Sequence, residues 1–129
     1  MKRIVRRKLQ IPANVQPILN PQYSLSFDKG TEEVTLMFTR MSYDPNTDYT
    51  GSISIKTKDA EKPFNRDLVL PEKHGVNNST YNSRYVYTFN APTLFHSSLT
   101  WEFYINPVQS EPITIDIISL INDNEYFYD

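Results

Sequence analysis

The sequence predicts an all-β protein, an antiparallel β-sandwich with an extended N-terminal arm. Apolar and polar residues alternate with a period of two in about seven segments. Loops rich in Pro, Asn, Asp and Ser separate these segments, and no window of ten or more residues has a helical apolar stripe. An antiparallel sheet with one apolar face must cover that face with a second layer, so a sandwich follows. Immunoglobulin-like and jelly-roll connections both fit this number of strands.

The alternating segments locate the strands. They are residues 23–27, 34–39, 51–57, 68–70, 84–89, 99–105 and 113–117. Trp101, Phe103 and Ile105 share one face of their segment, and three isoleucines share one face of the last segment. These faces are predicted to form the core.

The composition fits one domain that folds by packing alone. The chain has 129 residues, of which 39% are hydrophobic and 13% aromatic, enough for a ring-rich core. The absence of cysteine excludes disulfides, thiolate catalysis and Cys-ligated metal sites. Charged residues interrupt every apolar run before it reaches the length of a signal peptide or a membrane span. We therefore predict a protein made and kept in a cytoplasm, without membrane contact.

Residues 1–21 are predicted to form the arm, and residues 22–129 the sandwich domain. Pro12, Pro17 and Pro21 each remove a backbone donor and favour extended geometry in the residue before them. The first eight positions hold five of the 13 Lys and Arg residues, so the remaining 121 positions hold eight cations against 15 acids, a net charge of −7. Because arm and body differ in sign, the arm is predicted to dock on an acidic neighbour, including a second copy of this body.

The arm also contains apolar residues that an idle tail would not need, so we expect a partner to order it. The alternative is that part of the arm forms an edge strand of the body. The cations have no aromatic residue between them to stack on bases, which argues against sequence-specific nucleic-acid binding. The predicted partner-binding residues are Lys2, Arg3, Arg6, Arg7, Lys8, Ile11, Ile18 and Leu19.

One acidic motif resembles the start of a calcium loop. Asp44, Asn46 and Asp48 form D-x-N-x-D, the alternating oxygen ligands of such loops. Tyr49 stands at the sixth position, where the loop needs Gly, and Ile55 stands at the twelfth, where it needs Glu. A solvated turn held by side-chain caps explains the pattern better than a calcium site.

Catalytic and cofactor motifs are missing from the sequence. His74 and His96 are the only histidines, and one imidazole beside Glu72 does not make a zinc site. Neither a G-x-S-x-G elbow nor a glycine-rich phosphate loop occurs, because the three glycines are far apart. The sequence thus predicts no enzyme, no catalytic residue, no metal and no cofactor.

Aromatic residues supply an alternative function, a carbohydrate-binding module in which Tyr85, Tyr87 or Trp101 stacks on sugar rings. The core prediction is the stronger one for Trp101. Tyr85 and Tyr87 share one face of their segment while Val86 points the other way, so one side is expected to present two phenols to water or to a partner. Residues 126–128, Tyr-Phe-Tyr among acids, form either a last strand or a tail that docks elsewhere.

Several features together resemble the small structural proteins of tailed phages, such as head fibres, capsid decoration proteins and the N-terminal attachment domains of baseplate proteins. They are the basic segment Lys2–Lys8, the three arm prolines, the cysteine-free β body and the Tyr- and Asn-rich, glycine-poor composition. The resemblance lies in architecture and not in a motif. It implies a multi-copy virion component, made in the host cytoplasm, whose arm locks it to neighbouring subunits or to the shell. The first hypothesis is therefore a non-enzymatic structural protein that forms a homo-oligomer or a larger assembly.

Overall fold

The computed structural model describes residues 2–27, 30–40, 49–58, 65–71, 84–90 and 99–122. The calcium-like motif at 44–48, both histidines and residues 126–128 lie outside these ranges. The described residues form eight strands and two short 3-10 helices: β1 (Lys2–Ile11), η1 (Pro17–Leu19), η2 (Pro21–Tyr23), β2 (Leu25–Phe27), β3 (Thr31–Arg40), β4 (Ser52–Lys58), β5 (Asn65–Val69), β6 (Arg84–Asn90), β7 (Leu99–Asn106) and β8 (Ile113–Asn122).

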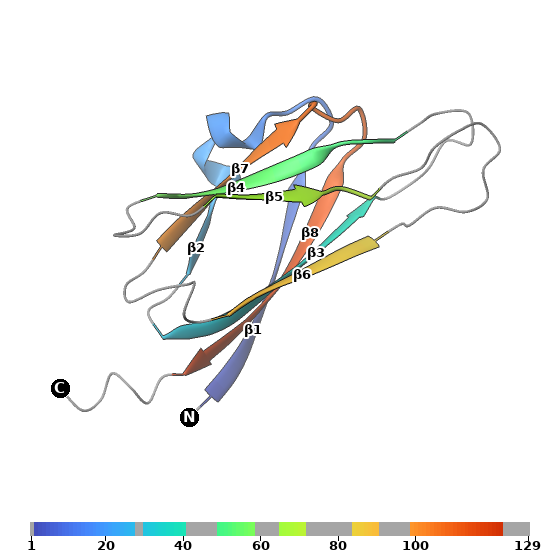
Figure 1. Ribbon diagram of the computed structural model, residues 1–129. Coiled ribbons are helices and arrows are strands. Elements are labelled where there is room, and N and C mark those ends of the chain that lie inside the picture. Colours follow the sequence, from blue (N-terminus) through green and yellow to red (C-terminus); the bar gives the residue numbers. More distant parts are fainter. Residues whose placement is uncertain are drawn as a thin grey trace.

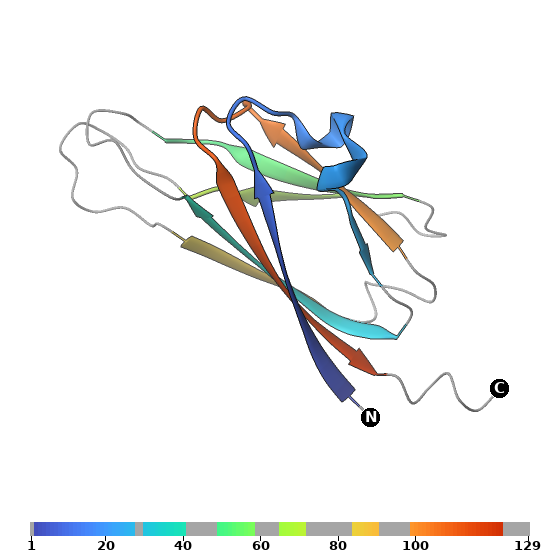
Figure 2. The ribbon, with the colours of Figure 1, turned by 180° about the vertical axis from the view of Figure 1, so that it is seen from behind.

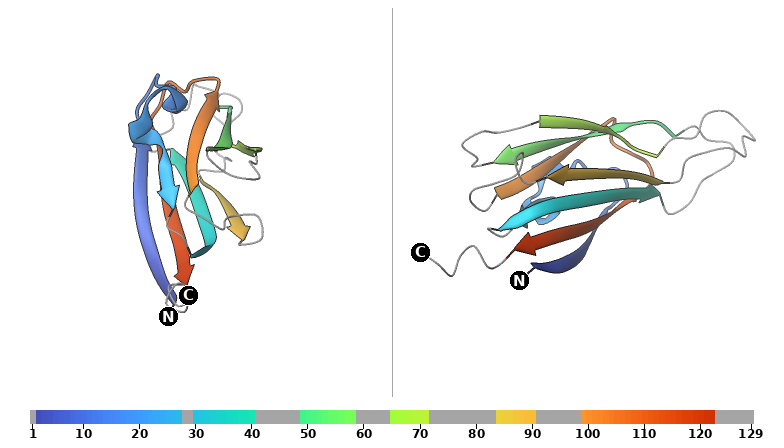
Figure 3. Two further views of the ribbon diagram at one scale, coloured as in Figure 1. Left: turned by 90° about the vertical axis from the view of Figure 1, so that its left-hand side faces the viewer. Right: turned by 60° about the horizontal axis from the view of Figure 1, so that its bottom comes forward.

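The strands form two four-stranded antiparallel sheets that pack face to face (Figure 1), which confirms the predicted all-β sandwich. The first sheet has the order β1-β8-β3-β6 and the second has the order β2-β7-β4-β5. Figure 3 separates the two layers. β1 pairs with β8, β2 with β7, β3 with β6 and β4 with β5, so the chain is rolled up as one long antiparallel ribbon. Of the two predicted connections, this is the jelly roll.

The core lies between the sheets and is built by the period of two. In β8 every second residue is buried, from Ile113 to Ile121. Trp101 is fully buried, with its ring edge-on to Phe27 at 4.8 Å and to Phe89 at 5.3 Å between centroids, so the core prediction for this residue is confirmed. The core residues are Ile11, Leu25, Phe27, Val34, Leu36, Phe38, Ile53, Ile55, Leu68, Leu70, Phe89, Trp101, Phe103, Ile105, Ile113, Ile115 and Ile117.

The N-terminal residues form part of the sandwich rather than an arm separate from it. Residues 2–11 are β1, which pairs with β8 from Lys2↔Asn122 to Ile11↔Ile113 (Figure 2). This is the edge-strand alternative, and position 21 does not separate two units. Residues 2–11 join the sheet because β1 covers the apolar edge of β8. The arm prolines fall outside the strand: Pro12 follows it, and the other two begin η1 and η2.

The segment after β1 crosses to the second sheet, where Gln16 substitutes for a strand. Its Nε2 donates to the Ile105 carbonyl at 2.8 Å, and its Oε1 accepts from the Ile105 N–H at 2.7 Å. On its other side Ile105 pairs with Ile53 of β4, whereas β2 reaches only residues 99–101 of β7. The Gln16 carboxamide therefore satisfies a stretch of β7 edge that the short β2 leaves uncovered.

Gln16→Ala is expected to lower the free energy of unfolding by about 1–3 kcal/mol, because two backbone groups of Ile105 lose their partner. Urea denaturation measures the change. Gln22→Ala is the matched control, since Gln22 is exposed, and it should change the free energy by less than about 0.5 kcal/mol. Equal effects of the two substitutions would contradict a strand-like role for Gln16.

A buried polar cluster lies where β3 ends and β8 begins. Arg40 is 5% exposed, and its Nε donates to the Pro71 carbonyl at 2.8 Å. Its Nη2 donates to Oε1 of Gln109 at 2.6 Å. The Gln109 Nε2 in turn donates to the carbonyls of Thr50 at 3.1 Å and Pro107 at 2.6 Å. The cluster ties the β7–β8 connection to β3 and to the start of β4.

Candidate functional site

The described ranges of the chain hold no cluster of potential metal ligands. Within them no three His, Asp or Glu side chains lie close enough to hold a metal ion. None of the helices in the same ranges is long and apolar enough to span a membrane. The surfaces that remain are the outer face of the first sheet and a pocket at the β1 edge.

The outer face is the side of the β1-β8-β3-β6 sheet that points away from the core. Cross-strand pairing places Ile4 beside Leu120, Arg6 beside Ile118, and Met37 beside Val86. Ile4 is 61% exposed and Val86 is 56% exposed. Between them Ile118, Leu120 and Met37 are half-buried. These five residues form an apolar stripe that crosses the face diagonally: Ile4, Leu120, Ile118, Met37 and Val86.

Charges of opposite sign flank the apolar stripe. On the β1 side lie Arg6 and Lys8, and Lys8 Nζ is 3.7 Å from Asp116 Oδ1. On the other side, Glu33 of β3 lies beside Leu120 and Asn90. The outer face thus joins an apolar stripe to a cationic and an acidic flank.

A second ion pair fixes the N-terminal end of β1. Lys2 Nζ lies 3.2 Å from Glu32 Oε2, and the Asn122 side chain donates to Glu32 Oε1 at 3.0 Å. The Asn122 hydrogen bond, followed by that of Lys2, lowers the pKa of Glu32 below its ordinary value. Glu32 therefore stays ionised at neutral pH, and Lys2 contacts its own chain.

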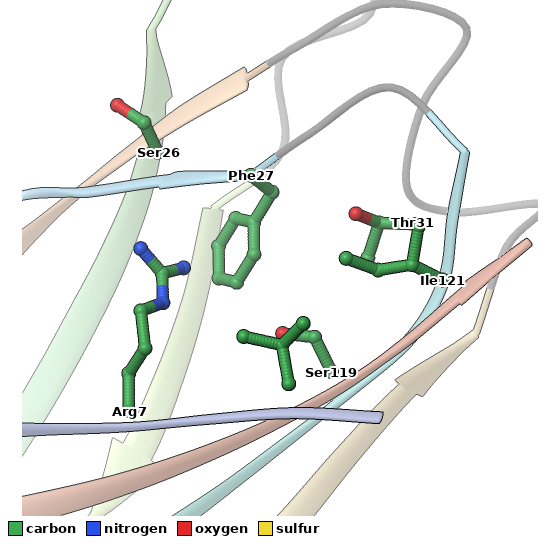
Figure 4. A pocket seen from close by; sticks show the side chains of 7 residues that line it. Arg7, Ser26, Phe27, Thr31, Ser119 and Ile121 are labelled. Atoms are coloured by element: carbon green, nitrogen blue, oxygen red, sulfur yellow. The ribbon is translucent and has the colours of Figure 1, made fainter. Parts of the chain in front are cut away.

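The pocket lies between β1 and β2, on the inner side of β1 (Figure 4). Its volume is about 110 Å³. Ser119 lies at its wall, only 2% exposed, and its hydroxyl has no hydrogen-bond partner. The Arg7 guanidinium sits 5.1 Å from the centroid of the Phe27 ring. The lining residues are Val5, Arg7, Ser26, Phe27, Thr31, Ser119 and Ile121.

The predicted partner-binding residues are divided among three environments. Ile11 is 1% exposed in the core and is not available to a partner. Ile18 is half-buried, whereas Leu19 is 81% exposed on η1. The five cations all lie on β1, where alternation separates them. Lys2, Arg6 and Lys8 share the outer side, and Arg3 and Arg7 share the inner side.

The aromatic residues predicted to bind sugar do not form an exposed platform. Trp101 has no open ring face. Tyr85 and Tyr87 pair with the buried residues Phe38 and Leu36 and face inward. The side chains that this strand exposes are Val86, Thr88 and Asn90. The Tyr87 hydroxyl donates to the Val69 carbonyl and accepts from the Val69 N–H, both at 3.0 Å. It thereby links the edge strands β6 and β5.

The sequence analysis missed two groups of residues. Tyr104, which faces opposite to Trp101 on β7, is 40% exposed and lies beneath Lys56 Nζ, 5.7 Å from the ring centroid. The alternation that assigned Trp101 to the core also predicts this exposure. The same period places Ser119 on the inner side of β8, in phase with Ile117. By contrast, no sequence signal identifies β2 as the other wall of the pocket.

Fold and surfaces define the class: a jelly-roll β-sandwich whose outer face carries an apolar stripe. No family model matches the sequence, and no curated protein matches it. Among solved structures, the chain is similar to the N-terminal endo-1,4-β-D-xylanase 10B of Clostridium thermocellum, CBM22-1–GH10 modules complexed with xylohexaose. The identity is 15% and the TM-score 0.35, over 80% of this chain and 19% of that chain. The chain therefore spans about a fifth of that protein's length, and a TM-score this low carries no functional inference.

Proposed function

We propose that this protein is a non-enzymatic structural protein that assembles with a second copy of itself through the outer face. The observation that carries the proposal is the apolar stripe across that face. Single exposed apolar residues are ordinary, but a contiguous apolar patch with a polar rim marks an interaction surface. Jelly rolls occur in viral capsid domains and in lectins, so the fold accommodates this role without deciding it. The placement in a phage particle rests on the resemblance described above.

The flanking charges favour a second copy as the partner. A two-fold axis that lies in the plane of the face, along the stripe, stacks the stripe of one copy on that of the other. The same rotation brings Arg6 of one copy over Glu33 of its partner. Because the two flanks have opposite sign, both contacts of the symmetric pair are attractive.

The size of the face predicts a modest affinity. Four strands about 4.8 Å apart and about 30 Å long present roughly 600 Å² in each copy. The pair would bury about 1,200 Å², the lower end of specific interfaces. We therefore expect association in the micromolar range, strengthened when many copies are held on one scaffold.

Light scattering after size exclusion, over a range of protein concentrations, tests the assembly. The native protein should rise from the mass of one chain towards that of two. Ile4→Glu with Val86→Glu should stay monomeric, because each new carboxylate would be buried against an apolar partner. Val108→Glu is the matched control, since Val108 is 40% exposed in the β7–β8 connection and lies off the face. A monomeric native protein at about 100 µM, or a double variant that associates like the native protein, would refute the proposal.

A charge exchange tests the predicted symmetry separately. Arg6→Glu should weaken association by about tenfold, since it faces the partner's Glu33. Adding Glu33→Arg to the same chain should restore it, because the exchanged charges meet again across the two-fold axis. Failure of the restoration, with association otherwise intact, would reject this docking geometry.

A further inference from the structure

We propose that the pocket between β1 and β2 binds a carboxylate group through Arg7 and Ser119. This site is distinct from the outer face, because Arg7 and Arg6 are adjacent in sequence and project to opposite sides of β1. The inference therefore holds or fails independently of self-assembly.

The buried hydroxyl of Ser119 is the first group that indicates a ligand. Ser119 is 2% exposed and projects from the inner side of β8, where its neighbours in phase are isoleucines. Its hydroxyl has no hydrogen-bond partner, although nearly all buried polar side chains in proteins have one. Ser119 lines the pocket, so a ligand in the pocket can supply the missing partner.

Arg7 is the second group. Its guanidinium lies over the Phe27 ring in the lining of the same pocket (Figure 4), and no acid of the described residues forms an ion pair with it. This contrasts with Lys2 and Lys8 of the same strand, each of which has an acidic partner. A guanidinium presents a planar fork of N–H donors that matches the two oxygens of a carboxylate. Arg7 thus supplies the charge, and the Ser119 hydroxyl supplies a further donor.

The shape and lining of the pocket limit the rest of the ligand. With a volume of about 110 Å³, the pocket suits a small ligand. Val5, Phe27 and Ile121 give one side of the pocket an apolar surface. A carboxylate on a short aliphatic stem satisfies both halves of the pocket. Either a short-chain acid in solution or the side chain of a glutamate from another protein has this chemistry.

Butyrate is the probe, because it has the carboxylate and short aliphatic stem that a short-chain acid and a glutamate side chain share. NMR spectra of methyl-labelled protein are recorded while sodium butyrate replaces sodium chloride at constant ionic strength. The Val5 and Ile121 methyl resonances should shift, and the shifts should saturate at millimolar butyrate. Butyramide, which has the same shape without the charge, should cause no saturable shift. If the butyrate shifts fail to saturate, or butyramide reproduces them, the pocket holds water only and the proposal is refuted.

Substitutions at Arg7, Ser119 and Arg6 test which side chains bind the butyrate carboxylate. Arg7→Gln and Ser119→Ala should each weaken butyrate binding at least tenfold, whereas Arg6→Gln, the matched control on the outer side, should change it by less than twofold. Ser119→Ala should also raise the thermal midpoint in carboxylate-free buffer, because it removes an unsatisfied buried hydroxyl. Unchanged butyrate binding in folded Ser119→Ala would overturn the assignment.

Peptides distinguish the two sources of the carboxylate, a short-chain acid in solution and a glutamate of another protein. Acetyl-Gly-Glu-Gly-amide is compared with its Gln counterpart and with butyrate. Binding of the Glu peptide at least tenfold tighter than butyrate, with shifts of β1 backbone amides, assigns the pocket to a glutamate of a protein partner. Binding of butyrate without comparable binding of the Glu peptide assigns it to a short-chain acid in solution. Equal binding of the Glu and Gln peptides would reject recognition of a carboxylate.

Discussion

Deletion of residues 2–11 is expected to leave a chain that does not fold. β1 pairs along its whole length with β8, and Ile11 is buried in the core with Leu9 packed against it. Loss of one fully buried Ile costs about 2–5 kcal/mol, whereas domains of this size have about 5–15 kcal/mol in total. The deletion also exposes the apolar inner row of β8 at a new sheet edge. Together these losses exceed the stability of the domain.

Far-ultraviolet circular dichroism and thermal unfolding measure the outcome. The truncated chain should show no cooperative transition and should bind a dye that reports exposed apolar surface. Arg6→Gln with Lys8→Gln is the control, because it removes charge from β1 but keeps its backbone, and it should unfold cooperatively. A truncated chain with a native-like transition would show that residues 2–11 are a dispensable arm.

Gly51→Ala is expected to destabilise the protein by about 2 kcal/mol. A Cβ at this position would lie 2.5 Å from Nε2 of Gln109. The amide is held by its bonds to Thr50 and Pro107 and accepts from the buried Arg40, so it has little freedom to move. Displacing it breaks a hydrogen bond to a charged group, which contributes about 1.5–3 kcal/mol.

A double-mutant cycle in urea tests this mechanism. In the Gln109→Ala background the clash is gone, so Gly51→Ala should be neutral or stabilise by about 0.5 kcal/mol, because alanine restricts the unfolded chain. The coupling between the two substitutions should therefore reach about 2 kcal/mol. Additive effects would mean that Gly51 acts through something other than its approach to Gln109.

The strand pattern could be predicted because the period of two is a local property. The segments at 34–39 and 113–117 lie within β3 and β8, and the face shared by Trp101 and Phe103 is the buried one. β1 was missed as the primary prediction because Arg3 and Arg7 occupy its inner positions, which hides the alternation. An edge strand tolerates such residues, since its inner side borders the opening between the sheets.

The candidate sites depend on contacts that no local pattern encodes. Whether Tyr87 or Val86 faces water is decided by the side of β6 on which the second sheet packs. The diagonal stripe arises from the register of β1, β8, β3 and β6, four segments distant in sequence. The sequence predicted Arg6 and Arg7 alike from their charge, whereas the position of Arg7 beside Phe27 became visible only in the structure.

The cations of β1 also bear on how copies of this protein avoid uncontrolled aggregation. An edge strand of ten residues is a template for another strand, and repeated addition of strands leads to fibrils. Two β1 strands laid side by side would bring five positive charges against five, so growth in the plane of the sheet is repelled. The proposed stacking through the outer face would meet no such repulsion and would close after one partner. In that proposal, the same strand would favour a finite complex over an open-ended one.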